Sequence, residues 1–156
     1  MKPMFSLKGM MLQERPSPYG LDETVEMIRQ NAQAIDWVVS GVKEMHHSVK
    51  KHGGPDILPV MLVELCKASF AGRILLDDAA RYASVMMPCT ISAYTKADGR
   101  TYVTNIRAGL MGTLMGGTVA EVMNEVAEEQ AKILEFLAAG EPAPVAASTL
   151  DSPDNL

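Results

Sequence analysis

The chain has 156 residues, of which 47% are hydrophobic and 21% are charged, so it is long enough to bury one sizeable core. Its formal net charge of -5 argues against a nucleic-acid partner, because phosphate binding needs clustered basic side chains. Residues 108–120 form the longest uncharged stretch and are shorter than the ~20 residues of a membrane-spanning helix. Lys8 interrupts the only apolar run near the amino terminus, so no export signal is expected. We therefore expect a cytoplasmic protein with no membrane partner.

Apolar spacing predicts four elements in the first third of the chain. The residues before Pro16 predict a short extended strand. Apolar residues at helical spacing predict a helix over residues 22–36, and the β-branched segment at 37–39 predicts a strand that Gly41 ends. Residues 42–52 then predict a polar helix that ends at a Gly-Gly-Pro sequence.

A strand and a hairpin are predicted in the middle of the chain. Residues 58–66 have few polar interruptions and predict a strand that is buried on both faces. A short helix is expected at 68–76. Beyond it, the turn sequence Asp98-Gly99 predicts a hairpin of strands 87–96 and 100–106. A two-residue turn would place Tyr94 opposite Val103 and Cys89 on the apolar face.

The last third predicts a flexible glycine-rich connector over residues 109–117, followed by a long helix over 118–139. Thr118 and Glu121 have the spacing of a capping box at the start of this helix. The proline-containing residues 141–156 lack apolar surface and predict a disordered tail. The expected architecture is a single α+β domain over residues 1–140, with a small mixed or antiparallel sheet packed with helices.

Two short motifs carry a family resemblance. Residues 63–66 read Val-Glu-Leu-Cys, and residues 87–89 read Met-Pro-Cys, followed by Tyr94 and by Asp-Gly-Arg at 98–100. The arrangement resembles DUF302, a family of uncharacterised bacterial and archaeal domains, over residues 23–106. The resemblance implies a compact α+β domain that pairs as a homodimer, and it implies no established enzymatic activity.

The chain departs from the family pattern at two places. The family commonly has Asn-Pro after its first cysteine, whereas Lys67 and Ala68 follow Cys66 here. The family also lacks a long carboxy-terminal helix. The helix predicted at 118–139 could cover its own sheet or pack on a partner subunit, and we slightly favour the partner contact.

Cys66 and Cys89 are the only two cysteines, and each lies in one of the family motifs. A thiolate can bind a soft metal, carry sulfur or act as a nucleophile, whereas a buried thiol can also be simply a small apolar side chain. Glu64 would share a strand face with Cys66, and Met87 is close to Cys89 in the sequence. Methionine, with 12 copies in the chain, would add thioethers suited to copper(I) or haem, although it also fills core gaps well.

His46 and His47 could complete a metal site with the two cysteines, although adjacent residues of a helix point in different directions. We therefore expect a pocket for a small ligand, a soft metal or haem, with Glu64, Cys66, Cys89 and Met87 as ligand-binding residues. The metal ligands would come from Cys66, Cys89, His46 and His47. The alternative is a thiol-dependent redox or sulfur-transfer protein that uses Cys89 or Cys66, and no catalytic residue is identified beyond these thiols.

Overall fold

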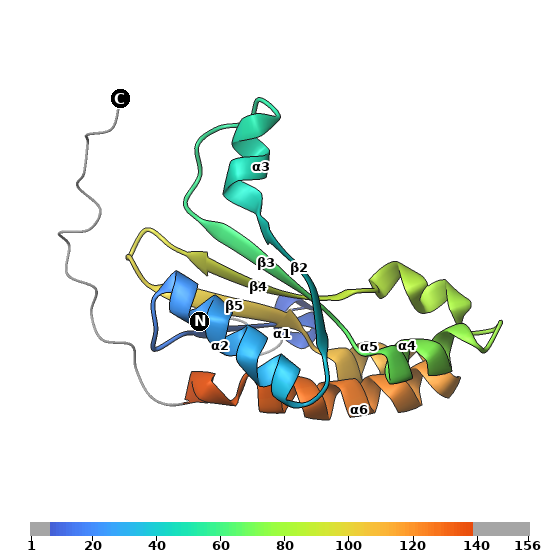
Figure 1. Cartoon of the computed structure of the whole chain (residues 1–156). Helices are drawn as coiled ribbons and strands as arrows, with labels where there is room; N and C mark the ends of the chain where they lie inside the picture. Colours follow the sequence, from blue (N-terminus) through green and yellow to red (C-terminus); the bar gives the residue numbers. More distant parts are fainter. Residues whose placement is uncertain (1–6, 139–156) are drawn as a thin grey trace, which may run out of the picture.

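The computed structural model describes residues 7–138 of the chain. Five strands form one antiparallel sheet with the order β1-β5-β4-β3-β2, and helices cover it (Figure 1), which confirms the α+β prediction. The predicted tail at 141–156 lies outside the described residues. The strands are β1 (Leu12–Pro16), β2 (Val38–Glu44), β3 (Val60–Cys66), β4 (Cys89–Thr95) and β5 (Thr101–Ile106). The helices are α1 (Leu7–Met11), α2 (Leu21–Ala34), α3 (Met45–Lys51), α4 (Ala68–Leu75), α5 (Ala108–Met115) and α6 (Gly117–Ile133), with 3-10 turns η1 (Arg81–Met86) and η2 (Glu135–Ala138).

The sheet buries only one of its two faces. Side chains alternate between the faces of a strand, and the inner side chains of Val63, Ile91 and Val103 in β3, β4 and β5 are fully buried. No residue that points outward from these three strands is buried. The prediction that the β3 segment is buried on both faces was therefore wrong, because an antiparallel sheet can leave one face to solvent.

The long helices α2 and α6 supply the apolar layer over the inner face. Ile28 of α2 and Val122 and Ile133 of α6 are fully buried in the same core as the sheet residues. The side-chain amide of Asn31 donates to the Ile133 carbonyl oxygen at 3.0 Å and joins the two helices. The apolar stripe of α6 thus covers the sheet of its own chain, which corrects our preference for a partner contact.

Strand β2 is longer than predicted, and α3 is correspondingly shorter. Val42 and Lys43 were expected in a helix, but they pair with Val63 and Leu62 of β3. The strand passes through a bulge between Val39 and Gly41, where a glycine was expected to end it. Pairing with a neighbouring strand therefore outweighed the local helical pattern.

The β4–β5 hairpin has a longer turn than the two residues predicted. Lys96 N donates to Arg100 O at 3.1 Å, and Gly99 turns with a φ of 77°. The register consequently shifts by one residue, and Tyr94 lies opposite Tyr102 rather than Val103. Cys89 lies on the inner face as predicted, whereas Thr104 and Ile106 lie on the outer face.

The glycine-rich segment is a helix, α5, and not a flexible connector. Gly112 is buried against α6, where a Cβ atom at this position would lie 2.6 Å from the Met123 Cβ. Glycine is thus needed for close helix packing. Thr118 donates its hydroxyl to Asp77 Oδ2 at 2.9 Å, and no side chain caps α6, so the predicted capping box is absent.

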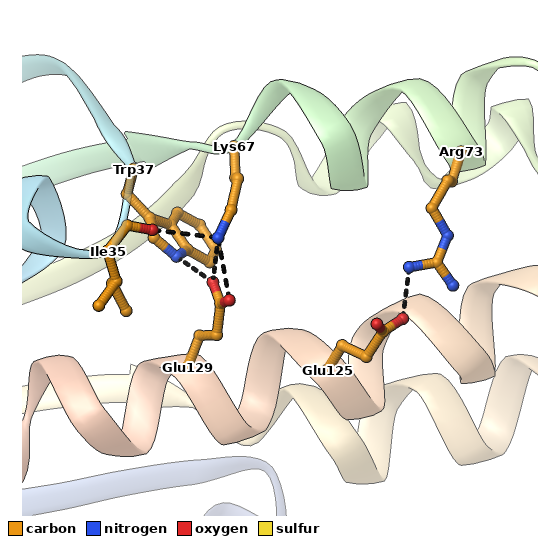
Figure 2. Close-up of polar contacts among 6 residues, drawn as sticks. All are labelled: Ile35, Trp37, Lys67, Arg73, Glu125 and Glu129. Atoms are coloured by element: carbon orange, nitrogen blue, oxygen red, sulfur yellow. Dashed lines mark hydrogen bonds and ion pairs between the residues drawn. The ribbon is translucent and has the colours of Figure 1, made fainter.

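A half-buried polar cluster ties α6 to the sheet (Figure 2). Lys67 Nζ donates to both carboxylate oxygens of Glu129, at 2.9 and 3.0 Å, and to the Ile35 carbonyl oxygen at 3.0 Å. Trp37 Nε1 donates to the same carboxylate at 2.6 Å. The Lys67 and Glu129 side chains are only 18% and 21% exposed. This cluster therefore orders the end of β3 and the start of α4 against α6.

Replacement of Glu129 by glutamine should lower the free energy of unfolding by about 1–3 kcal/mol, because it leaves the half-buried Lys67 ammonium without a counter-charge. The matched control is Glu125→Gln on the same helix. Glu125 pairs with Arg73, and both side chains are more than 40% exposed, so the loss should stay below about 1 kcal/mol. Urea unfolding of the three proteins measures both values. Equal losses would contradict the proposed role of the Glu129 cluster.

Candidate functional site

A small cavity of about 40 Å³ lies where β3 ends and β4 begins. The cysteines Cys66 and Cys89 both line it, together with Met87. The rest of the wall is almost entirely apolar and comes from the surrounding helices and turns. These further residues include Trp37, Leu65, Phe70, Ile74, Ala83, Met86, Val122, Met123 and Val126.

Strand pairing brings the two cysteines into the same region. Leu65 pairs directly with Cys89, and Cys66 follows Leu65 as the last residue of β3. Alternation alone would put the two thiols on opposite faces of the sheet. They border one cavity because both lie at the same end of the β3–β4 pair. Cys66 ends β3 just before α4, and Cys89 begins β4 just after η1.

Both thiols are free and partly buried. Burial raises the pKa of the Cys89 thiol above its ordinary value, and the neighbouring Cys66 raises this pKa further. A group with a raised pKa stays protonated at neutral pH. Cys89 is consequently a poor nucleophile until something displaces its proton.

Lys67 also lines the cavity, but its ammonium group is already neutralised. Its three hydrogen-bond acceptors are the two Glu129 oxygens and the Ile35 carbonyl oxygen, and its charge lies 5.2 Å from the Phe70 ring centroid. The cavity wall is therefore apolar and carries no unpaired charge, and the sulfur atoms are the groups on it that could bind a soft ligand.

The volume limits what the cavity can hold. A space of about 40 Å³ accommodates a single ion or a few water-sized groups, whereas small-molecule pockets usually measure ~300–1,000 Å³. A porphyrin does not fit this space. Among the ligands considered from the sequence, the geometry favours one soft ion over haem.

Glu64 lies apart from the cavity. It pairs with Thr90 on β4 and with Gly41 on β2, and its outward-facing side chain passes close to Gly41, where a Cβ atom would lie 3.2 Å from Glu64 Oε2. It does not line the cavity. The structure therefore brings together Cys66, Cys89 and Met87 but not Glu64.

The two histidines lie at the other end of β3. His46 Nδ1 is 3.2 Å from the carbonyl oxygen of Val60, the first residue of the strand. Val60 and Cys66 are the first and last of the seven residues of β3, so they lie about 20 Å apart along the extended strand. Figure 1 shows α3 at one end of the β2–β3 pair and α4 at the other. One ion cannot bind the histidines and the cysteines together.

His46 and His47 nevertheless converge with each other. Both lie in the first turn of α3, and their ring centroids are 4.2 Å apart. His47 Nδ1 is 2.9 Å from Glu44 Oε2. One ligand atom from each of these three residues lies within 4.8 Å of the others. The expectation that the adjacent histidines diverge was wrong, because the ring positions depend on side-chain rotamers as well as on helix geometry.

Three further cavity residues, Trp37, Lys67 and Phe70, were not predicted from the sequence. Lys67 directly follows Cys66, and Trp37 is the only tryptophan in the chain, so both had a sequence signal. Phe70 lies one helical turn beyond Lys67 and had no signal other than its apolar character.

No helix within residues 7–138 has the length and apolar character that crossing a membrane requires.

Comparison with known proteins supports the resemblance seen in the sequence. Residues 13–137 match the family described as "Domain of unknown function DUF302". A crystal structure of an uncharacterized conserved DUF302 protein from Bacillus stearothermophilus is similar, with a TM-score of 0.71 and 16% sequence identity, and the match covers 81% of this chain and 97% of that one. No curated protein matches the chain. The match across most of the sequence shows that the chain belongs to the DUF302 family of domains of unknown function.

Proposed function

We propose that this DUF302 domain binds one soft metal ion, of the copper(I) class, through the thiolates of Cys66 and Cys89. The observation that carries the proposal is that both cysteines border a single small cavity with Met87 on its wall. Thiolate and thioether sulfur are the ligand types that select copper(I) in proteins. The free thiols fit a cytoplasmic location, where cysteines stay reduced.

The protonated state of Cys89 fits metal binding better than thiol catalysis. A soft ion binds by displacing the thiol proton, so a raised pKa makes its affinity depend on pH without preventing binding. A redox or sulfur-transfer reaction at Cys89 would need a thiolate in the free protein, and burial disfavours that form. The alternative function therefore has less support from the geometry.

Titration of the full chain with copper(I), in competition with a copper(I)-specific chromophoric chelator, tests the ligand set. Cys66→Ser and Cys89→Ser should each weaken binding by about 100-fold or more, and Met87→Leu should weaken it by about tenfold. Met10→Leu is the matched control, because Met10 lies exposed in α1 away from the cavity wall. His47→Ala should also leave the affinity unchanged. Undiminished binding in both serine variants would contradict the proposal.

The affinity for copper(I) should rise with pH. Because burial raises the pKa of the Cys89 thiol, this thiol is protonated at neutral pH, and each displaced proton contributes up to ~10-fold per pH unit. The same chelator competition, repeated between about pH 6 and pH 8, measures the slope. An affinity that does not rise over this range would contradict the thiols as ligands.

We also propose that the chain forms a homodimer through the outer face of its sheet. The support is that this face carries apolar side chains that no described layer buries, with Leu12 of β1 40% and Ile106 of β5 43% exposed. These two residues are register partners, so their side chains form an apolar pair at the β1–β5 edge of this face. A second copy of the same face would bury it.

Light scattering on the full chain should give twice the mass of one chain. Ile106→Glu should convert the dimer to a monomer, because the interface would then have to bury an unpaired carboxylate. Leu114→Glu, on the exposed surface of α5, should leave the dimer intact. A wild-type monomer, or a dimer that only the Leu114 variant disrupts, would overturn this assignment.

A further inference from the structure

A second hollow, of about 390 Å³, lies at the β1 edge of the sheet and is separate from the cysteine cavity. Its floor is the inner face of β1 and β5, with Gln13, Arg15 and Asn105. Its walls are the first turn of α5 and the second half of α6. The hollow persists beneath α6 because the facing helix residues Ala127 and Ala131 are small.

The charge in this hollow is one-sided. Arg15 and Arg107 line it, and no aspartate or glutamate does so. One hydrogen bond orients the Arg107 side chain, because its Nε–H donates to the Gly9 carbonyl oxygen at 3.0 Å. In a chain with a net charge of -5, this concentration of positive charge without acidic neighbours favours an anionic occupant.

Arg15 is a partly buried cation at the floor of the hollow. Its Nε atom is buried and has no hydrogen-bond acceptor among residues 7–138. Burial lowers the pKa of Arg15, and the charge of Arg107 lowers it further, so the folded protein holds this cation at a cost. A buried donor without an acceptor is unfavourable for stability, and such a cost is typical of groups that serve a ligand.

Asn105 makes the complementary half of the site. Only 7% of this residue is exposed. Its side-chain nitrogen donates to the Ile106 carbonyl oxygen at 3.2 Å, while Oδ1 is buried and has no donor among the residues that the structure describes. The hollow thus offers an unused donor on Arg15 and an unused acceptor on Asn105. Because residues 13 and 105 are register partners and residue 15 lies two positions along the same face, the two groups lie on neighbouring strands.

We propose that this hollow binds a small organic carboxylate that carries a hydroxyl or amino group on the adjacent carbon. The carboxylate accepts hydrogen bonds from the planar guanidinium of Arg15, which suits a planar anion. The adjacent hydroxyl or amino group donates to Asn105 Oδ1. The first turn of α5, at residues 108–110, forms the wall beside the anion and has backbone N–H groups without intrahelical acceptors.

The proposal predicts discrimination between closely related probes. Lactate has both required groups, propionate lacks the donor, and inorganic phosphate is an anion of different shape. In ¹⁵N–¹H spectra of the full chain, lactate should shift the side-chain signals of Arg15 and Asn105 and the backbone signals of residues 108–110. Lactate should bind about tenfold more tightly than propionate, because propionate leaves Asn105 Oδ1 unpaired. Equal binding of the two acids, tighter binding of phosphate, or no binding of lactate at tens of millimolar would overturn the proposal.

Variants separate a binding role for Arg15 from a structural one. Arg15→Met should reduce the affinity for lactate by about tenfold or more and should leave the melting temperature unchanged or higher, because it removes a buried donor that has no acceptor. Arg29→Met, on the exposed surface of α2, should change neither quantity. A lower melting temperature with unchanged lactate binding would assign Arg15 a structural role. Cys66→Ser should retain lactate binding, so the outcome is independent of the metal site.

Discussion

The structure depends on one constraint, which is that the sheet must bury a single apolar face under helices drawn from both ends of the chain. Ile28 from α2 and Ile133 from α6 meet Ile91 of the sheet in one core. The Lys67–Glu129 pair fixes the end of β3 against this helical layer. Because α6 is anchored there, the layer also shapes two spaces beneath it, a small sulfur-lined cavity at one end and a larger arginine-lined hollow at the β1 edge.

The chain's long-range architecture was partly predictable because several segments have strong local periodicity. The apolar stripes of α2 and α6 and the Asp98-Gly99 turn gave correct element types. The errors arose where a distant partner decides the structure. Val42 and Lys43 extend β2 because β3 pairs with them, and residues 108–115 become a helix because α6 packs against Gly112. Neither the β2–β3 pairing nor the packing of Gly112 on α6 can be inferred from the local sequence pattern.

The candidate cavity was predictable to a smaller extent. The expected pocket requires the strands bearing Cys66 and Cys89 to be neighbours, and they are adjacent in the sheet. Glu64 was grouped with them because it shares a strand face with Cys66, and the histidines because they could complete a metal site. Glu64 does not line the cavity, and the histidines lie at the other end of β3. The Arg15 hollow had no sequence signal, because an unpartnered donor becomes visible only when the packing around it is known. The proposed binding in this hollow depends on two polar atoms, Arg15 Nε and Asn105 Oδ1, that have no hydrogen-bond partner among the described residues.

The central functional claim is that Cys66 and Cys89 bind the same ion. Copper K-edge X-ray absorption of the full chain loaded with one equivalent of copper(I) tests it most directly. The account predicts a first coordination shell of sulfur atoms alone, and it predicts that Cys66→Ser and Cys89→Ser each reduce the sulfur count in that shell. A shell composed mainly of nitrogen or oxygen would contradict the account, because it would place the ion at the Glu44, His46 and His47 cluster instead.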